Sequence, residues 1–409
     1  MTIRKIAPAG VPYKITELLP ALWGAFASAD IRSVVGKALC QHAGIKHCFV
    51  VNSGRAAFTI ILKALMKTAP PDRDEVVIPA YTCFSVPSSI VRAGLKIRLA
   101  DLDPGKIDYD YRKLGEVDFR KVLAIIPCNL FGIVSDWKEL TAIARQNNLE
   151  IIDDSAQTFG IIHDGRQSGS WGKAGFYSFG RGKNITAVGG GAIMTDSDEL
   201  AAAIAESMNR AKPPRPTDDI KAFLKIVVYS IFLRPYFFWI PESLPFLGLG
   251  KTVYDENFPI AGLSRLQTAV LLDMLKKIEW LNTVRAENAR FLAESIAKDE
   301  TTGGFVIPGR RTDYIPPYLR LPVLAPSNSL RRKAIADLNR AGIGASTMYP
   351  STIKDIPGLE SHLVGTENKY PGAAILADRL FTLPTHPYVA RKDLEIISRI
   401  LGRLSERSE

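Results

Sequence analysis

The sequence predicts an α/β protein: a large domain with a mostly parallel sheet between layers of helices, followed by a smaller α+β domain. Two observations support this prediction. Between residues 46 and 200, short β-branched runs alternate with amphipathic stretches, a pattern typical of parallel sheets. After a long helical repeat, residues 318–409 contain a strand pattern and then two helical patterns.

The large domain contains the expected strands His47–Val51, Glu75–Pro79, Ile97–Ala100, Val122–Pro127, Leu149–Asp154, Gly175–Ser178 and Ala192–Thr195. Amphipathic helices are expected between them, for example over Arg55–Lys67 and Asp136–Gln146. Ligands bind beyond the carboxyl ends of such strands. Ser53, Asn129 and Asp154 each follow an expected strand, so we expect a site there.

The rest of the chain divides into simpler pieces. Residues 1–45 are expected to form an N-terminal helical arm, and residues 46–262 the large domain with an apolar insert at 211–255. Apolar residues at helical spacing over 264–296 predict one long helix, which opens the last unit, 263–409. That unit contains the expected strand Tyr318–Val323 and the expected helices Ser329–Ala341 and Arg391–Leu404.

Composition is that of a globular protein of 409 residues, with 46% hydrophobic and 23% charged residues. Its four cysteines show no metal-binding or disulfide spacing, and no apolar run of signal-peptide length follows Met1, so we expect a cytoplasmic protein without a metal site. The formal net charge of +10 favours anionic partners. Because no nucleic-acid motif accompanies the charge, we expect no nucleic-acid partner.

Lys183 is the most informative residue of the chain. It lies five positions after Ser178 and about 30 after a strand that ends in Asp153-Asp154. Pyridoxal phosphate needs such a set: a lysine amine for its aldehyde, a carboxylate for its pyridine nitrogen and a hydroxyl for its phosphate. Neighbouring residues point to opposite sides of a strand, so only one aspartate faces a ligand, and we expect Asp154. Helix capping by this pair is a compatible alternative.

Three further parts of the sequence complete the expected cofactor site. Ser53-Gly54-Arg55 begins a helix, where free N–H groups and the helix dipole favour a phosphate, although a plain helix cap has the same pattern. Tyr81 or Phe84 is expected to stack on the pyridine ring, and a role as core aromatics is equally plausible for each. Gln157 is placed to reach the ring hydroxyl.

The ordered set of motifs resembles the DegT/DnrJ/StrS family of sugar aminotransferases, a branch of the fold-type I pyridoxal phosphate enzymes. The resemblance runs from about residue 45 to the C-terminus. It rests on Asn52–Ala57, Asp74–Thr82, Asp101–Pro104, Ile151–Gly160, Tyr177–Asn184, Ala341–Ile343 with Tyr349-Pro350, and Leu383–Pro387.

The resemblance implies a homodimer with active sites at the subunit interface, and an amino group moved from an amino acid, usually glutamate, to a keto-sugar on a nucleoside diphosphate. Such enzymes serve the biosynthesis of polysaccharides, glycoconjugates or secondary metabolites. It implies that Lys183 carries the cofactor and moves the proton. Asp154 then pairs with the pyridine nitrogen, and Gln157, Ser178, Ser53, Gly54 and Arg55 surround the rest of the cofactor. Asn129, Tyr349 and His386 are the expected substrate-binding residues.

The chain departs from the family pattern in three places. Asn129 stands where the family often has histidine. The family's Asn-Tyr-Arg segment, whose asparagine reaches the partner subunit's cofactor phosphate, has its nearest counterpart in Asn257, which stands somewhat far from Leu266. The insert at 211–255 is unusually apolar.

Several alternatives remain at this point. Another pyridoxal phosphate enzyme, a dehydratase or a lyase, is the first; a dehydratase is expected to lack the lysine. A non-catalytic regulator on the same fold is the second. For the insert, the aromatics Tyr229, Tyr236, Phe237, Phe238 and Trp239 with Lys221, Lys225 and Arg234 suggest a peripheral contact of residues 220–249 with the inner face of a membrane. Packing within a dimer, or over the active-site mouth, is the competing interpretation.

Overall fold

The computed structural model describes residues 4–14, 16, 18–27, 30–127, 129–244, 252–297, 304–310, 314–365, 367 and 369–406. Cys128 and residues 245–249 of the apolar insert therefore lie outside the described residues.

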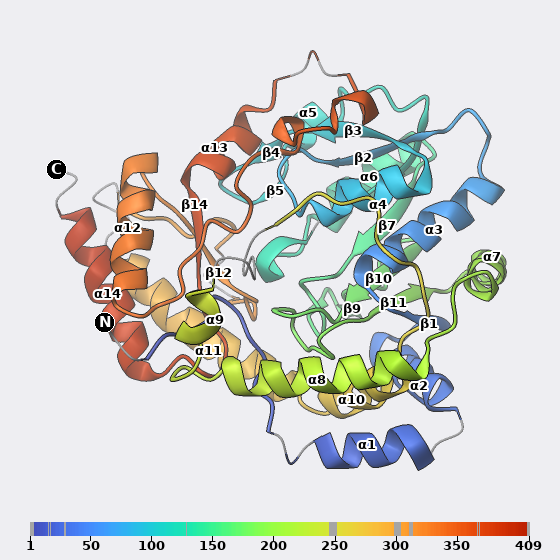
Figure 1. Cartoon of the computed structure of the whole chain (residues 1–409). Coiled ribbons are helices and arrows are strands. Elements are labelled where there is room, and N and C mark those ends of the chain that lie inside the picture. Colours follow the sequence, from blue (N-terminus) through green and yellow to red (C-terminus); the bar gives the residue numbers. More distant parts are fainter. Residues whose placement is uncertain are drawn as a thin grey trace.

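The large domain is built around an eight-stranded sheet with the order β1-β11-β10-β7-β6-β2-β3-β13 (Figure 1). Its strands are β1 (His47–Val51), β2 (Glu75–Pro79), β3 (Lys96–Ala100), β6 (Val122–Ile125), β7 (Glu150–Asp154), β10 (Ala174–Ser178), β11 (Gly191–Thr195) and β13 (Leu363–Val364). β11 is antiparallel to both of its neighbours, and the remaining pairs are parallel. The predicted α/β class is thus confirmed.

Helices cover this sheet, and its central strands are therefore buried on both faces. The principal ones are α3 (Gly54–Thr68), α4 (Ser85–Ala93), α6 (Trp137–Gln146) and α7 (Asp198–Asn209). Every expected strand of this domain is present within a few residues. β13 was not expected: it comes from the far C-terminal part of the chain and is only two residues long, so it leaves no periodic signal.

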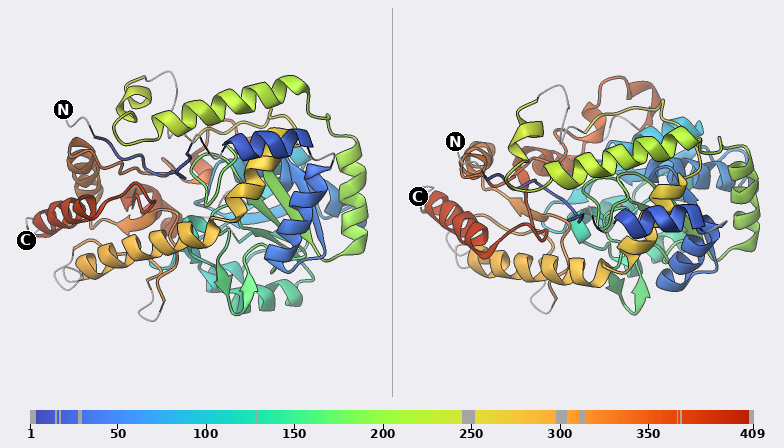
Figure 2. Two further views of the ribbon diagram at one scale, coloured as in Figure 1. Left: turned by 90° about the horizontal axis from the view of Figure 1, so that it is seen from below. Right: turned by 60° about the horizontal axis from the view of Figure 1, so that its bottom comes forward.

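The expected single helix over 264–296 is wrong. The chain forms α10 (Arg265–Leu275) and α11 (Ile278–Ala297), with a turn at Lys276 and Lys277 between them (Figure 2). The two helices have different partners: α10 lies against the N-terminal helices α1 (Leu18–Ala27) and α2 (Ile31–Ala43), and α11 lies against the C-terminal helix α14 (Arg391–Ser405). The turn redirects the chain from the large domain to the small one.

The small domain pairs β12 (Leu321–Leu324) with β14 (Leu380–Leu383) in an antiparallel sheet. α12 (Asn328–Arg340), α13 (Pro371–Arg379) and α14 complete it, so both expected helices are present. The expected strand Tyr318–Val323 begins three residues late, because the Leu319 amide donates to the Phe131 carbonyl of the large domain at 2.9 Å.

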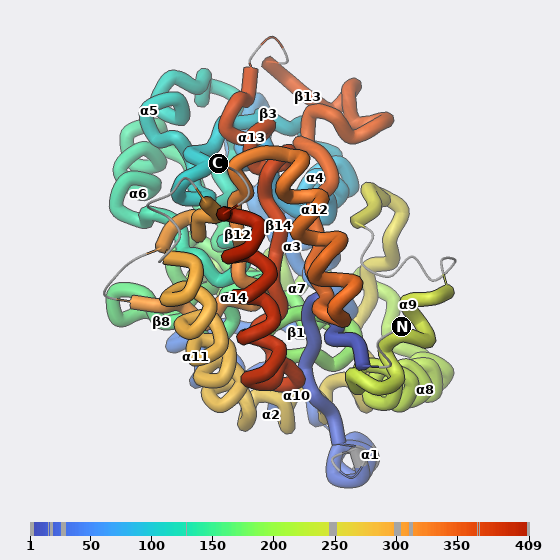
Figure 3. Tube along the Cα trace, turned by 90° about the vertical axis from the view of Figure 1, so that its left-hand side faces the viewer, coloured from blue at the N-terminus to red at the C-terminus, as the bar shows by residue number. Residues whose placement is uncertain are grey.

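The first residues of the expected helical arm form an extended segment, residues 4–13, before α1 and α2 begin. It crosses from the small domain to the large one (Figure 3). Its contacts are an Arg4–Asp393 ion pair of 2.5 Å, a bond from the Ile6 amide to the Gly342 carbonyl of 2.8 Å, a 2.8 Å bond between His386 Nε2 and the Ala7 carbonyl, and a bond from the Tyr13 hydroxyl to the Thr186 carbonyl. This segment ties the two domains together.

The apolar insert folds into α8 (Pro216–Phe232) and α9 (Trp239–Glu242) on the outside of α10. No helix in the described part of the chain has the length and hydropathy required to cross a membrane.

His386 lies in the contact between the N-terminal segment and the small domain, and its ionisation allows the stability of the protein at low pH to be tested. Burial lowers the pKa of its imidazole from 6.5 to about 4, so the folded protein holds it neutral. Because the pKa is lower in the folded protein than in the unfolded chain, this histidine favours the folded state when the pH is above 6.5. That contribution to stability disappears as the pH falls from 6.5 towards 4. We expect the melting temperature to fall between about pH 7.5 and about pH 5, and His386→Gln to reduce that fall. Equal falls in both proteins would contradict this assignment.

Candidate active site

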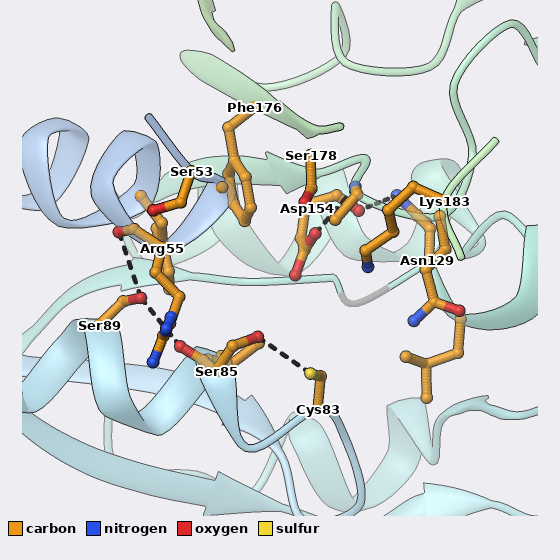
Figure 4. Close-up of a pocket in the computed structure, with 16 residues that line it drawn as sticks. Ser53, Arg55, Cys83, Ser85, Ser89, Asn129, Asp154, Phe176, Ser178 and Lys183 are labelled. Carbon is orange, nitrogen blue, oxygen red and sulfur yellow. Dashed lines mark hydrogen bonds between the residues drawn. The ribbon is translucent and has the colours of Figure 1, made fainter. Parts of the chain in front are cut away.

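A cavity of about 220 Å³ lies at the carboxyl ends of β6, β7 and β10 and at the starts of α3 and α4 (Figure 4). It is lined by Ser53, Gly54, Arg55, Phe58, Cys83, Ser85, Val86, Ser89, Asn129, Leu130, Asp154, Ala156, Gln157, Phe176, Ser178 and Lys183. Sequence motifs more than 100 residues apart therefore meet in one place, because parallel strands end at the same edge of the sheet.

Lys183 reaches the cavity from the loop that joins β10 to β11. The base of that loop is closed by the Phe179 amide, which donates to the Gly190 carbonyl at 2.9 Å, and by the Ala187 amide, which donates to the Phe179 carbonyl at 3.1 Å. Figure 4 shows the amine between Asp154 and Asn129. Within the described residues no ion pair engages this amine.

Asp153 and Asp154 face opposite ways, as expected for neighbours in a strand. Asp153 is completely buried and accepts from Ser155 Oγ (2.8 Å), the Gly169 amide (2.7 Å) and Asn129 Nδ2 (2.9 Å). Burial raises the pKa of the Asp153 carboxyl, and these hydrogen bonds oppose the rise. Only Asp154 of the pair lines the cavity, where its Oδ1 accepts from the Ala156 amide at 3.0 Å.

Asn129 joins the two aspartates. Its Nδ2 donates to Asp153 Oδ1 and to the Asp154 carbonyl, at 2.9 and 3.1 Å, and its Oδ1 accepts from the Ser135 amide at 3.0 Å. The side chain was expected to bind substrate. It lines the cavity, but its amide is already used to fix the end of β7.

Gln157 is held in a similar way. Its Oε1 accepts from the Phe131 amide at 3.0 Å, and its Nε2 donates to the Tyr349 hydroxyl at 2.9 Å. Tyr349 is buried and does not itself line the cavity, but its hydroxyl holds Gln157, which does. The small domain thereby positions a residue of the large domain.

The other end of the cavity suits an anion. The first N–H groups of α3 have no partner within the helix, and Ser53 caps that helix through the Ala56 amide at 3.1 Å. Ser178 lies so close that a Cβ on Gly54 would stand 2.8 Å from the Ser178 Cβ. Helix α4 begins with Ser85 on the same side. Two helix starts and their serines therefore surround the site where a phosphate would bind.

Arg55 lies at the mouth of the cavity. Its Nη1 is 3.3 Å from Asp255 Oδ2, and its guanidinium lies 4.7 Å from the centre of the Phe258 ring. Both partners belong to the segment before α10. Asn257 lies in that segment, exposed, and outside the cavity lining.

Three other expected residues lie away from the cavity lining. The Tyr81 ring is buried and packs edge-on against Tyr349 at 5.6 Å, and Phe84 is buried in the core beside α4. His386 is buried against the N-terminal segment, where the Tyr388 amide donates to its Nδ1 at 3.3 Å. Tyr81 and Phe84 are thus core aromatics, which is the alternative to stacking on the pyridine ring that the sequence left open.

Sequence reasoning missed several lining residues: Phe58, Cys83, Ser85, Val86, Ser89, Leu130, Ala156 and Phe176. A signal for some of them exists. Cys83-Phe84-Ser85-Val86-Pro87 follows β2, and a serine close before a proline is typical of a helix start. Phe176 has no comparable signal: it stacks on Phe58 with ring centres 5.0 Å apart, a contact between β10 and α3.

Arg285 supports the lysine loop from behind. It is completely buried, and its Nη2 donates to the Asn184 carbonyl at 2.7 Å, next to Lys183. Burial lowers the pKa of this guanidinium to about 10. A helix that leads into the small domain thereby holds the backbone that carries the cavity lysine.

The residues present fit pyridoxal phosphate. An amine, a carboxylate and an anion site line one cavity, in the arrangement that its aldehyde, pyridine nitrogen and phosphate require. Seven of the ten residues predicted to bind the cofactor lie in the lining: Ser53, Gly54, Arg55, Asp154, Gln157, Ser178 and Lys183.

The chain is similar to several known enzymes. The chain is 35% identical over 166 residues to a GDP-perosamine synthase of Caulobacter vibrioides; the match covers 41% of this chain and 44% of that relative, less than half of its length. It is 25% identical to a UDP-2-acetamido-2-deoxy-3-oxo-D-glucuronate aminotransferase of Pseudomonas aeruginosa over 89% of this chain and 88% of that one.

Among solved structures, an E. coli GDP-4-keto-6-deoxy-D-mannose-3-dehydratase with bound hydrated PLP superposes with a TM-score of 0.77, at 17% identity, over 97% of this chain and 99% of that one. That likeness shows the fold. The model of the DegT/DnrJ/EryC1/StrS aminotransferase family matches residues 29–224 and 254–401, most of the chain. The chain therefore belongs to the DegT/DnrJ/EryC1/StrS aminotransferase family.

Proposed function

We propose that this chain is an aminotransferase with pyridoxal 5′-phosphate as its cofactor, and that it moves an amino group from an amino acid to a keto-sugar. One observation carries the proposal: Lys183, Asp154 and the start of α3 line the same cavity. Taken singly, each of these three features is also compatible with other roles. Their convergence is what pyridoxal phosphate chemistry needs.

When bound, pyridoxal phosphate would supply an electron sink for transamination. Asp154 would hold the proton on the pyridine nitrogen through its negative charge. The Lys183 amine accepts and returns the proton that moves during transfer. Ser53, Ser178 and the first amides of α3 would bind the phosphate, and Asn129 would keep Asp154 directed at the ring by fixing the end of β7.

The acceptor in this proposal is a keto-sugar on a nucleoside diphosphate, and the donor is glutamate. Two relatives named for nucleotide sugars support the acceptor, as does the net charge of +10, which suits a pyrophosphate. The family resemblance supports glutamate and a homodimer with shared active sites. We place the enzyme in the cytoplasm, in polysaccharide, glycoconjugate or secondary-metabolite biosynthesis, with a peripheral membrane contact as a separate proposal.

A sugar dehydratase on this fold is the second candidate, since one solved structure of similar fold has that activity. Lys183 favours the aminotransferase, because the lysine carries the proton that transamination moves and a dehydratase is expected to lack it. The same lysine, with Asp154 beside it, also disfavours a non-catalytic regulator.

Lys183→Ala should abolish amino transfer, because no other amine lines the cavity among the described residues. Borohydride should attach the cofactor covalently to the peptide that contains residue 183 in the unmodified protein, and to no peptide of the variant. Peptide mapping and 2-oxoglutarate release from glutamate are the measurements. Lys173→Ala, at an exposed lysine, is the control and should behave as the unmodified protein. A label elsewhere would refute the assignment.

Asp154→Asn should lower kcat by several orders of magnitude while the protein stays folded, because the neutral amide no longer holds the pyridine proton. Asp153→Asn, at the neighbouring buried position, is the matched comparison. It should lower the melting temperature and leave the absorbance of the bound cofactor unchanged, because its hydrogen bonds are structural. The reverse pattern would exchange the roles of the two residues.

Gly54→Ala should weaken cofactor binding by about tenfold or more, because the added Cβ would lie 2.8 Å from the Ser178 Cβ and move the phosphate site. Gly36→Ala is the control, since its Cβ meets nothing nearer than 3.7 Å. Titration of each apoprotein with pyridoxal phosphate gives the affinities. Equal affinities would show that α3 can withdraw from β10 at no cost.

A further inference from the structure

Helix α8 has two apolar faces, and the described residues cover only one. Ala222, Ile226 and Ser230 are buried towards α10. On the opposite side Ile220, Leu224 and Val228 are 62%, 57% and 52% exposed, and Phe223, at the edge of the buried face, is 37% exposed. At 3.6 residues per turn Ile220, Leu224 and Val228 form one stripe along the helix, here called the outer face of α8.

The apolar surface continues past the end of the helix. Tyr236, Phe237 and Trp239, in and before α9, are each more than two-fifths exposed. The views in Figures 1 and 3 agree that α8 and α9 lie on the same side of the molecule. Tyr229, which the sequence suggested as part of this surface, is excluded: its ring packs on Tyr13 and its hydroxyl accepts from the Val11 amide at 3.0 Å.

Cations border the outer face, and the acids near it are already engaged. Lys221, Lys225 and Arg234 are exposed, and no ion pair with them is found in the described part of the chain. The nearby acids have other partners: Asp218 accepts from the Arg215 amide, Asp219 accepts from the Leu266 amide, and Glu242 pairs with Lys5. The surface therefore combines exposed apolar side chains with three exposed cations that form no ion pair among the described residues.

This combination favours one occupant over two others. The outer face is no cover for the active site, since no residue of α8 lines the cavity. A second copy docked by the same face would bring the unpaired cations Lys221, Lys225 and Arg234 of the two copies close together. An anionic bilayer offers acyl chains to the stripe and phosphates to the three cations.

We propose that the outer face of α8, with the aromatic residues before and in α9, binds the surface of an anionic lipid bilayer. α8 lies in the plane of the interface, with Ile220, Leu224 and Val228 directed into the acyl region. Lys221 and Lys225 extend from one flank to the phosphate groups. Tyr236 and Trp239 lie at the headgroup level, where aromatic rings with a polar edge are favoured. This proposal does not rest on the reaction that the enzyme performs.

The test is flotation of the holoenzyme with vesicles of phosphatidylcholine alone and of phosphatidylcholine with phosphatidylglycerol. We expect binding to the anionic vesicles that weakens as salt is added. The triple variant Ile220→Ser, Leu224→Ser, Val228→Ser should lose more than about 100-fold in partition. Lys221→Gln with Lys225→Gln should lose about 30-fold, since each lysine near an anionic surface contributes about a factor of five.

Met66→Ser with Ile162→Ser is the matched control, since both side chains are exposed and apolar on other elements. It should float like the unmodified protein. Cofactor absorbance and melting temperature show that each variant is folded. Absence of flotation at low salt would overturn the proposal. So would a triple variant that binds vesicles normally but sediments as a smaller oligomer, a result that would assign the outer face to a second copy.

Discussion

The buried carboxylate of Asp153 gathers hydrogen-bond donors from three parts of the chain. Asn129 follows β6, Ser155 follows β7, and Gly169 belongs to the loop before β10. A buried charge is costly unless such partners surround it, so the loops beyond the strands are held to one arrangement. Because these bonds fix Asp153 on one side of the strand, its neighbour Asp154 must point to the opposite side, into the cavity. This anchor decides which of the two aspartates faces the cavity.

The cavity lysine depends on contacts between the two domains. Arg285 of α11 holds the backbone beside Lys183, Tyr349 of the small domain holds Gln157, and the Tyr13 hydroxyl of the N-terminal segment binds the Thr186 carbonyl of the lysine loop. The positions of Lys183 and Gln157 therefore depend on contacts made outside the large sheet. His386 belongs to this interdomain contact, which explains why its neutral, buried imidazole lies outside the cavity lining.

The surface of α8 obeys a different constraint. A helix on the outside of a protein normally has one apolar stripe, which faces the core. Here the inner stripe packs on α10, and the outer stripe remains at the surface beside positive charge. Exposed apolar surface of this kind usually marks an interaction site. The family match ends at residue 224 and resumes at residue 254, so Ile220 and Leu224 lie at its edge, and Val228 and the aromatic residues at 236–239 lie outside it.

Local patterns in the sequence were sufficient for the α/β class, the strands around residues 47, 75 and 150, and the set of Ser53, Asp154, Ser178 and Lys183. They suffice because period-two runs, helix starts and strand ends are decided by near neighbours. Contacts between distant residues decided the rest. The Leu319–Phe131 bond delays β12, the turn after Leu275 directs α10 and α11 to different helix partners, and packing on Tyr349 buries Tyr81. Phe176 enters the cavity only because β10 lies against α3. Such pairings depend on where the folded chain places each surface, and no local period in the sequence encodes that placement.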